Sequence, residues 1–75
     1  MTKLSDTKRG NVGYILKING DRQFKKKLFV MGILEGEKFL VENVSPMGSP
    51  IVVNVKQARV ALRREEAENV IVDLS

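Results

Sequence analysis

The chain has 75 residues, enough for one small domain that buries about 60% of the surface its unfolded form exposes. Hydrophobic residues make up 43% and charged residues 29%, which is typical of a folded globular protein and not of a disordered segment. The absence of Cys and His excludes disulfides, thiolate or imidazole metal ligands, and nucleophilic catalysis of the Ser/His/Asp or Cys/His kind. We therefore expect a single domain over residues 1–75 that is not an enzyme and holds no cofactor or metal.

The net charge of +4 is unevenly distributed along the chain. Residues 1–30 carry eight Lys or Arg against two Asp, a net +6, whereas residues 31–75 carry five against seven acidic residues, a net −2. A basic first half favours an acidic protein surface, a phosphate-bearing partner or an anionic membrane face, and charge alone does not choose among them.

No targeting or membrane segment is evident. The longest apolar run, residues 28–34, is far shorter than the ~20 residues that a membrane helix requires, and residues 1–11 lack the apolar core of a signal peptide. We expect a cytoplasmic protein that does not itself span a membrane.

The first eighteen residues predict a polar segment followed by a strand. Leu4 is the one apolar anchor of the segment, and Lys8–Asn11 indicates a turn. Residues 12–18 are rich in β-branched and aromatic residues and predict the first strand. Alternation places four of its side chains on one face and Ile15 on the other, so we expect the strand to bend and use both faces. The four are Val12, Tyr14, Leu16 and Ile18.

A short helix is predicted next, with Asp21 as its N-cap and Gly32 as its stop. Its core stripe has the i, i+4, i+7 spacing and consists of Phe24, Leu28 and Met31. Its other face is both apolar and positive, and carries Lys25, Lys26, Phe29 and Val30. An exposed apolar pair ringed by charge is a usual form of docking site, although a solvated face or a helix covered on both sides would give the same pattern.

Four further strands are predicted in the second half of the chain. They span residues 38–44, 51–55, 59–63 and 70–74, with a short hairpin connection at 56–58 and one helical turn at 64–68. Ile51, Val53 and Val55 are expected to point inward. Phe39 and Val41 are expected to share one face of their strand, and Val60 and Leu62 one face of theirs. Glu65, Glu66 and Glu68 are expected to be solvated and paired with Arg63 and Arg64.

The loop between the second and third strands is rich in proline and glycine. A rigid, exposed loop beside the helix would help to shape a recognition cleft, so Pro46, Met47 and Pro50 are added to the candidate docking residues. Five short, evenly spaced strands without long crossover helices favour a mainly β fold, an antiparallel sheet curled into a small barrel.

The order of motifs resembles the FeoA family over most of the chain, from about Leu4 to Asp73. The most specific pieces are the Leu28-x-x-Met31-Gly32 step and the Ala-Leu-Arg-Arg-Glu-Glu-Ala run at 61–67. The other matching residues are Gly10, Ile15, Ile18, Lys27, Gly36, Pro46, Gly48, Pro50 and Val55.

The resemblance implies an SH3-like barrel that serves beside FeoB, the GTP-driven ferrous iron transporter of the bacterial inner membrane, and it carries over no catalytic residue. Lys27 stands where the family often has arginine, which keeps the charge but loses the bidentate fork. Because it adjoins Lys25 and Lys26 on the helix, Lys27 is counted with them among the candidate docking residues. Gln57 stands where the family often has glycine, so the last hairpin is expected to use another turn.

Three functional classes follow. The leading one is a non-catalytic binding module that acts on the cytoplasmic part of FeoB. A nucleic-acid-binding barrel is a weaker alternative because only Tyr14 and three Phe residues are available for stacking, most of them needed in the core. A module for Pro-rich peptides is another, although the chain has no Trp and one Tyr to line a groove. Phe29 and Val30 would also suit a self-association patch, which leaves a homo-oligomer open.

Overall fold

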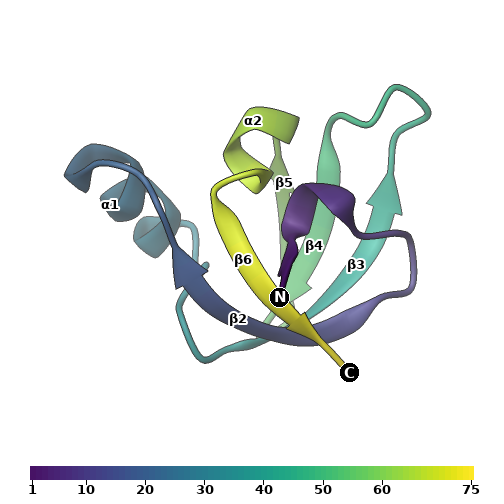
Figure 1. The fold of residues 1–75 in the computed structure, drawn as a ribbon, viewed down its shortest axis with the longest axis horizontal. Coiled ribbons are helices and arrows are strands. Elements are labelled where there is room, and N and C mark those ends of the chain that lie inside the picture. Colours follow the sequence, from purple (N-terminus) through teal and green to yellow (C-terminus); the bar gives the residue numbers. More distant parts are fainter.

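The computed structural model describes residues 1–75 as one curled antiparallel sheet with short helices at its ends (Figure 1). In chain order the elements are β1 (Thr2–Lys3), the 3-10 helix η1 (Leu4–Asp6), β2 (Val12–Ile18), α1 (Arg22–Val30), β3 (Lys38–Val44), β4 (Ile51–Val55), β5 (Ala58–Leu62), α2 (Arg64–Ala67) and β6 (Val70–Leu74). The prediction of a mainly β fold with a helix after the first long strand and a helical turn before the last strand is confirmed.

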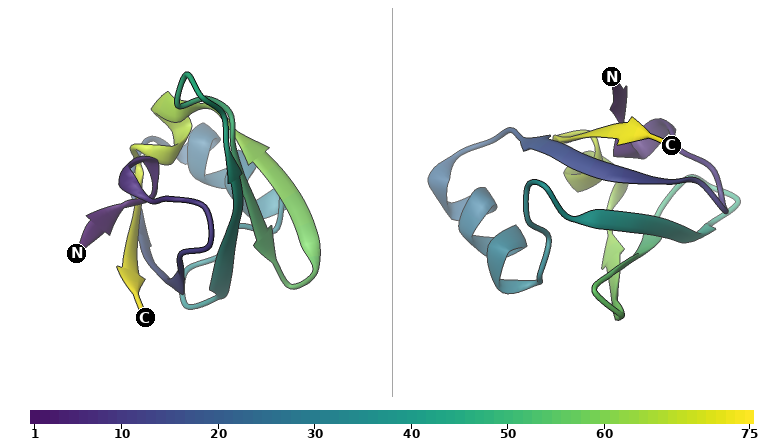
Figure 2. Two further views of the ribbon diagram at one scale, coloured as in Figure 1. Left: turned by 90° about the vertical axis from the view of Figure 1, so that its right-hand side faces the viewer. Right: turned by 90° about the horizontal axis from the view of Figure 1, so that it is seen from below.

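The six strands form one sheet in the order β1-β6-β2-β3-β4-β5, with every pair antiparallel. The sheet bends strongly around its own concave face, and α1 lies at one end of it (Figure 2). The sequence predicted five of these strands. The sixth, β1, is only two residues long, too short to show a periodicity, and it is specified by pairing with β6 at Thr2↔Val72 and Lys3↔Ile71.

The concave face encloses a single core of 15 buried apolar residues. The three side chains that were predicted to point inward from β4 are buried, and so are the two pairs that were predicted to share a face on β3 and on β5. The full set is Leu4, Ile15, Ile18, Leu28, Ile33, Phe39, Val41, Ile51, Val53, Val55, Val60, Leu62, Ala67, Val70 and Val72.

The prediction of which β2 side chains share a face of the sheet was partly wrong. Ile15 is buried, whereas Tyr14 and Leu16 are exposed on the convex side. The pairing of β2 with β6 shifts register between Ile15 and Lys17, so one extra residue is accommodated there and Ile18 also points into the core. A β-bulge shifts the alternation of inward and outward side chains by one residue, so Ile15 and Ile18 both face the core. It also bends the strand, as the sequence predicted.

The N-terminal segment is more ordered than its polar composition predicted. Leu4 is buried, which confirms it as an anchor. The hydroxyl of Thr7 is also buried and donates to the carbonyl of Leu4 at 2.6 Å, which closes the unpredicted turn η1. The segment therefore packs onto the sheet.

The β4–β5 hairpin closes through a two-residue turn, Lys56 and Gln57, with φ angles of 53° and 67°. Both residues adopt the left-handed conformation that glycine or asparagine usually supplies in such turns. The side-chain oxygen of Asn54 accepts the backbone N–H of Gln57 at 3.1 Å. β5 consequently begins at Ala58, one residue earlier than predicted.

Candidate functional site

α1 begins and ends where the sequence predicted. The carboxylate of Asp21 accepts the backbone N–H of Phe24 at 2.8 Å, the bond that an N-cap supplies. Gly32 has a φ of 90°, and the N–H of Ile33 returns to the carbonyl of Leu28 at 2.9 Å. This left-handed glycine turns the chain sharply back toward the sheet.

The inner face of α1 is anchored by one fully buried side chain. Leu28 is 0% exposed, and Phe24 and Met31 are half-buried against the core. The predicted core stripe is confirmed.

The outer face of α1 carries two of the most exposed apolar side chains of the protein. Phe29 is 66% exposed and Val30 is 75% exposed, while Lys25 and Lys26 are exposed beside them. Neither lysine forms an ion pair. The structure therefore presents an apolar pair with free positive charge at its edge, which we call the α1 face.

A groove of about 510 Å³ continues the α1 face toward the sheet. Its lining is Ile18, Lys25, Phe29, Ile33, Leu34 and Glu35. The carboxylate of Glu35 accepts the backbone N–H of Ile18 at 2.9 Å, which ties the segment after α1 to the end of β2.

Sequence reasoning did not assign Ile18, Ile33, Leu34 or Glu35 to the docking residues. The one available signal was the apolar run, which continues past Gly32 into Ile33 and Leu34. The contribution of Ile18 has no local signal because it comes from a different element.

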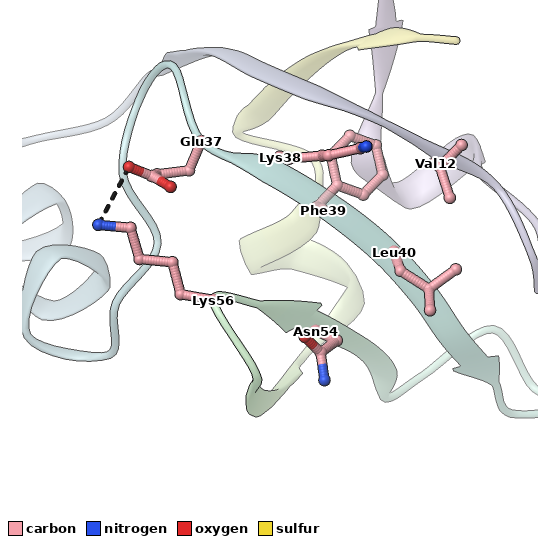
Figure 3. Close-up of a pocket in the computed structure, with 7 residues that line it drawn as sticks. All are labelled: Val12, Glu37, Lys38, Phe39, Leu40, Asn54 and Lys56. Carbon is pink, nitrogen blue, oxygen red and sulfur yellow. Dashed lines mark ion pairs between the residues drawn. The ribbon is translucent and has the colours of Figure 1, made fainter.

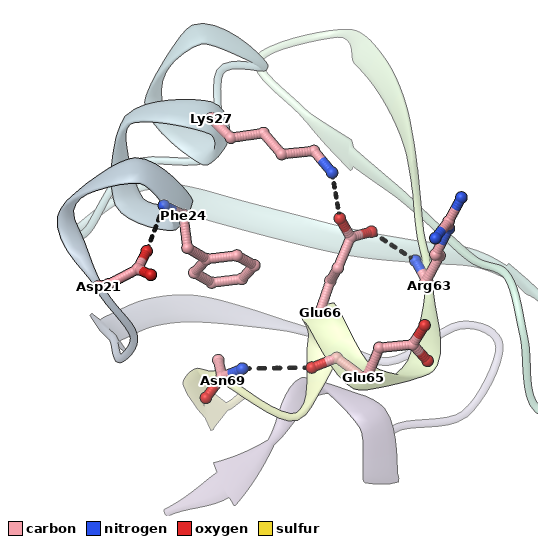
Figure 4. A network of polar contacts seen from close by, with 7 residues as sticks. All are labelled: Asp21, Phe24, Lys27, Arg63, Glu65, Glu66 and Asn69. Carbon is pink, nitrogen blue, oxygen red and sulfur yellow. Dashed lines mark hydrogen bonds and ion pairs between the residues drawn. The ribbon is translucent and has the colours of Figure 1, made fainter.

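Lys27 does not share the α1 face. Its ammonium reaches across to α2 and pairs with the carboxylate of Glu66 at 2.5 Å (Figure 4). The other oxygen of Glu66 accepts the backbone N–H of Arg63 at 2.8 Å. The hydrogen bond from Lys27, followed by that from the Arg63 backbone, holds the pKa of Glu66 below its ordinary value.

The contact bears on two predictions about these charges. Lys27 stays a predicted docking residue, and the structure adds that its ammonium links α1 to α2. Glu66 was expected to pair with Arg63 and Arg64, but its hydrogen bond with Arg63 is to the backbone N–H, and neither arginine side chain forms an ion pair.

The β3–β4 loop lies apart from α1. Pro46, Met47 and Pro50 are exposed, with Met47 90% exposed. The loop packs near α2, where the hydroxyl of Ser49 accepts the backbone N–H of Arg64 at 3.1 Å. Figures 1 and 2 show it at the opposite end of the sheet from α1. The prediction that this loop lies beside the helix was wrong, because the length of β3 and β4 carries it away.

A second hollow, of about 330 Å³, lies on the convex side of β2, β3 and β4 (Figure 3). It is lined by Val12, Glu37, Lys38, Phe39, Leu40, Asn54 and Lys56. Glu37 and Lys56 close one side of it through an ion pair of 3.2 Å.

Nearby on this convex side, Glu42 accepts hydrogen bonds from Asn54 at 2.8 Å and from Arg59 at 2.7 Å. The bond from Asn54 is the main reason that the pKa of Glu42 is lowered, with a further contribution from Arg59. These carboxylates are neutralised by fixed partners, which is the arrangement of a structural network and not of an acid–base pair.

No three acidic side chains come together as a metal-ligating group, and no helix has the length and apolar content needed to cross a membrane. Phe39 is buried and Phe24 packs on the core, so Tyr14 and Phe29 are the exposed aromatic side chains, on different elements. Of the surfaces described, the α1 face combines exposed apolar area, a groove and unpaired charge.

Comparison with known proteins gives consistent results. The family model of the FeoA domain matches residues 2–74. A crystal structure of an iron uptake regulatory protein, FeoA, superposes with a TM-score of 0.91 at 30% identity, covering 99% of this chain and 97% of that one. A zinc-complexed FeoA from Stenotrophomonas maltophilia, described as an SH3 domain protein, gives a TM-score of 0.81 at 26% identity, covering 97% of this chain and 91% of that one.

Among curated proteins, an Fe(2+) transport protein A/Fe(2+) transporter FeoB fusion protein from Porphyromonas gingivalis is 29% identical over 72 residues. The match covers 96% of this chain but only 8% of the fusion protein, so the two share one small domain of a much longer chain. The SH3-like fold is thus shared with solved FeoA structures, and the match to the family model spans nearly every residue. The chain belongs to the FeoA domain family.

Proposed function

We propose that this chain is a non-catalytic accessory protein of bacterial ferrous iron uptake and that it acts by binding the cytoplasmic part of a FeoB-type transporter. The observation that carries the proposal is the α1 face, where Phe29 and Val30 are exposed beside unpaired Lys25 and Lys26. It acts in the cytoplasm, at the inner face of the membrane that holds its partner.

The geometry of the α1 face supports docking to a protein. Interfaces commonly have an apolar centre and a polar, solvated rim. Phe29 and Val30 form such a centre, the groove beside Phe29 has room for an inserted side chain, and Lys25 and Lys26 lie at the edge. Exposure of a large aromatic side chain in water is unfavourable, and a partner that covers Phe29 removes that cost.

The relatives support the identity of the partner. In the Porphyromonas gingivalis protein, a part similar to this chain is fused to FeoB. Fusion keeps two parts at a high effective concentration and therefore suits parts that act together. The Stenotrophomonas maltophilia structure is described as possibly acting as a ferrous iron transport activating factor. Both descriptions agree with an accessory role for this chain.

To test the proposal, the triple variant Lys25→Glu, Lys26→Glu, Phe29→Ala is compared with wild type in two measurements. The first is copurification with the full-length FeoB-type transporter from the same organism, and the second is ferrous iron uptake in a strain lacking this protein. We expect copurification to fall at least tenfold and uptake to drop to the level of the deletion strain, because the variant removes the apolar centre and reverses the charged rim.

The matched control is Lys38→Glu, Arg64→Glu, Met47→Ala. It makes the same change in net charge and truncates one exposed apolar side chain, but it alters β3, α2 and the β3–β4 loop and leaves the outer face of α1 unchanged. The control also tests the β3–β4 loop through Met47, and we expect it to behave as wild type. If the α1 variant is folded and retains both copurification and uptake, the α1 face is not the docking site. If it instead changes the oligomeric state measured by light scattering, the face serves self-association.

A further inference from the structure

A second basic surface lies on the convex side of β1, β6 and β2. Lys3 on β1 and Lys17 on β2 each stand directly opposite Ile71 of β6, so the three residues form one row across three strands. A shallow hollow of about 410 Å³ surrounds this row and is lined by Met1, Thr2, Lys3, Lys17, Asn19 and Ile71. We call it the lysine hollow.

The charge of the lysine hollow is not neutralised by the protein. Lys3 and Lys17 are both exposed, and neither forms an ion pair. No acidic residue lines the hollow. The nearest acidic residue on β6, Asp73, shares the face of Ile71 but stands opposite Tyr14, one repeat further along the strand. Two free ammonium groups therefore flank an uncharged centre.

The centre of the hollow is apolar and its rim carries a protruding apolar side chain. Ile71 is half-buried between the two lysines, and Met1 is 98% exposed at the edge. In the headgroup region of a bilayer, ammonium groups meet lipid phosphates while apolar side chains reach the start of the acyl chains. The lysine hollow, with ammonium groups on either side of Ile71 and with Met1 at its edge, matches this arrangement of lipid phosphates and acyl chains.

Other anionic partners fit the lysine hollow less well. Protein interfaces are depleted in lysine at their centres, whereas here the lysines are the principal feature. Nucleic-acid sites on small barrels rely on aromatic side chains for base stacking, and none lines this hollow. Lysine on a flexible stem is suited to the diffuse negative potential of anionic lipids because it requires no fixed hydrogen-bond geometry.

We propose that the lysine hollow is a membrane-binding surface for bilayers that contain anionic phospholipids. The hollow shares no lining residue with the groove beside Phe29, so the lipid-binding surface and the proposed protein-docking surface are distinct. Each lysine near an anionic membrane strengthens binding about fivefold, so the attachment is weak and reversible by itself. It holds the chain at the membrane surface without an inserted anchor.

The test uses the purified full chain and sedimentation with large vesicles of phosphatidylcholine, with or without phosphatidylglycerol. We expect binding only to the vesicles with phosphatidylglycerol, and a decrease in that binding as salt is raised. The variant Lys3→Glu, Lys17→Glu should lower the partition coefficient more than tenfold. The neutral variant Lys3→Gln, Lys17→Gln should lower the partition coefficient by a smaller factor. It tests the proposal if the charge-reversed variant does not fold.

The matched control is Lys38→Glu, Arg64→Glu, which gives the same net charge through two exposed residues that also lack ion pairs. We expect it to keep most of the vesicle binding. An equal loss of vesicle binding in both variants would overturn the proposal, because binding would then depend on net charge and not on the lysine hollow. Absence of vesicle binding by wild type would also overturn it.

Two further measurements separate the lysine hollow from its competitors. Loss of vesicle binding in Lys25→Glu, Lys26→Glu with retention in the Lys3 and Lys17 variant would assign the membrane contact to α1 and contradict the proposal. Full displacement from vesicles by inorganic phosphate at constant ionic strength would indicate a site for a discrete anion and would also contradict it. Neither measurement involves the transporter, so the result stands apart from the proposed function.

Discussion

The curled sheet and α1 are held in place in different ways. The sheet combines ladders of backbone hydrogen bonds with a core to which nearly all its strands contribute. α1 contributes a single side chain, Leu28, to the 15 buried residues of that core. Its other attachments are the half-buried Phe24 and Met31 and the Lys27–Glu66 ion pair to α2.

Because of this difference, the sheet provides the stability of the fold, whereas α1 exposes the surface proposed for binding. The sheet has many cooperating contacts, so it fixes the shape of the molecule. α1 has few, and its outer face is mostly open to solvent, as the exposure of Phe29 and Val30 shows. Changes in the sheet should therefore lower the stability of the whole fold, whereas changes on the outer face of α1 should affect binding and leave stability nearly unchanged.

The largest effect on stability is expected at Gly13 in β2. A Cβ built there would lie 2.0 Å from the backbone oxygen of Asp73 and 3.0 Å from the Cα of Leu74, so β2 and β6 would have to separate. Gly13→Ala should lower the free energy of unfolding by about 3 kcal/mol or more, at the upper end of the cost of overpacking, because backbone cannot move aside as a side chain can. Urea denaturation measures the change.

Gly32→Ala is the matched control for this prediction. Gly32 has a φ of 90° but nothing within 4 Å of a built Cβ, so only the backbone conformation opposes the substitution. That cost is about 1 kcal/mol. If the two substitutions destabilise equally, the close contact between β2 and β6 does not restrict residue 13.

The next largest effect is expected at the single anchor of α1. Leu28→Ala should cost about 2–3 kcal/mol, at the lower end for a buried leucine, because a helix at the edge of the core settles toward the space left behind. Hydrogen exchange should show faster opening of α1 than of β3 or β4. Val30→Ala on the outer face serves as the control and should stay within about 0.5 kcal/mol of wild type. Equal acceleration of exchange throughout the protein would mean that α1 and the sheet unfold as one unit.

A smaller effect, dependent on pH, is expected at the contact between α1 and α2. Because the folded protein lowers the pKa of Glu66, its carboxylate stabilises the fold above the ordinary pKa of 4.5, and the stabilisation disappears as the pH falls through the lowered value. Glu66→Gln should therefore cost about 1 kcal/mol at pH 7 and progressively less below pH 4.5. Glutamine still accepts the Arg63 N–H, so the substitution isolates the ion pair.

Thermal unfolding of wild type and Glu66→Gln across this pH range checks the prediction, with Lys27→Gln completing a double-mutant cycle. A stability difference that stays constant from neutral to acidic pH would show that the charge of Glu66 is not the source of the stabilisation.

Much of the fold could be predicted because its signals are local. The N-cap at Asp21, the stop at Gly32 and the inward residues of β4 each depend on a few neighbouring residues. The resemblance to the FeoA family, carried by motifs spread along the chain, is matched by the family model over residues 2–74. The misplaced features were those that require a second, distant segment.

Three of those features show why the rest could not be predicted. β1 exists because β6, about 70 residues later, pairs with it. The bulge in β2 is defined by register against the same strand. The ion pair of Lys27 could not be predicted from its position on the helix, because its partner Glu66 is 39 residues away and only the folded chain brings the two together.

By itself, then, the sequence determined five of the six strands, the helix with its inner and outer faces, and the positive charge of the first half, since these follow from periodicity, caps and composition. The tertiary structure decided which charges stay free. It joined Lys27 to Glu66, carried the Pro46–Pro50 loop away from α1, added Ile18 and Ile33 to the groove beside Phe29, and placed Lys3 and Lys17 on either side of Ile71. The physical reason is that surfaces are formed by neighbours in space, and curling a sheet makes neighbours of residues that no local pattern relates.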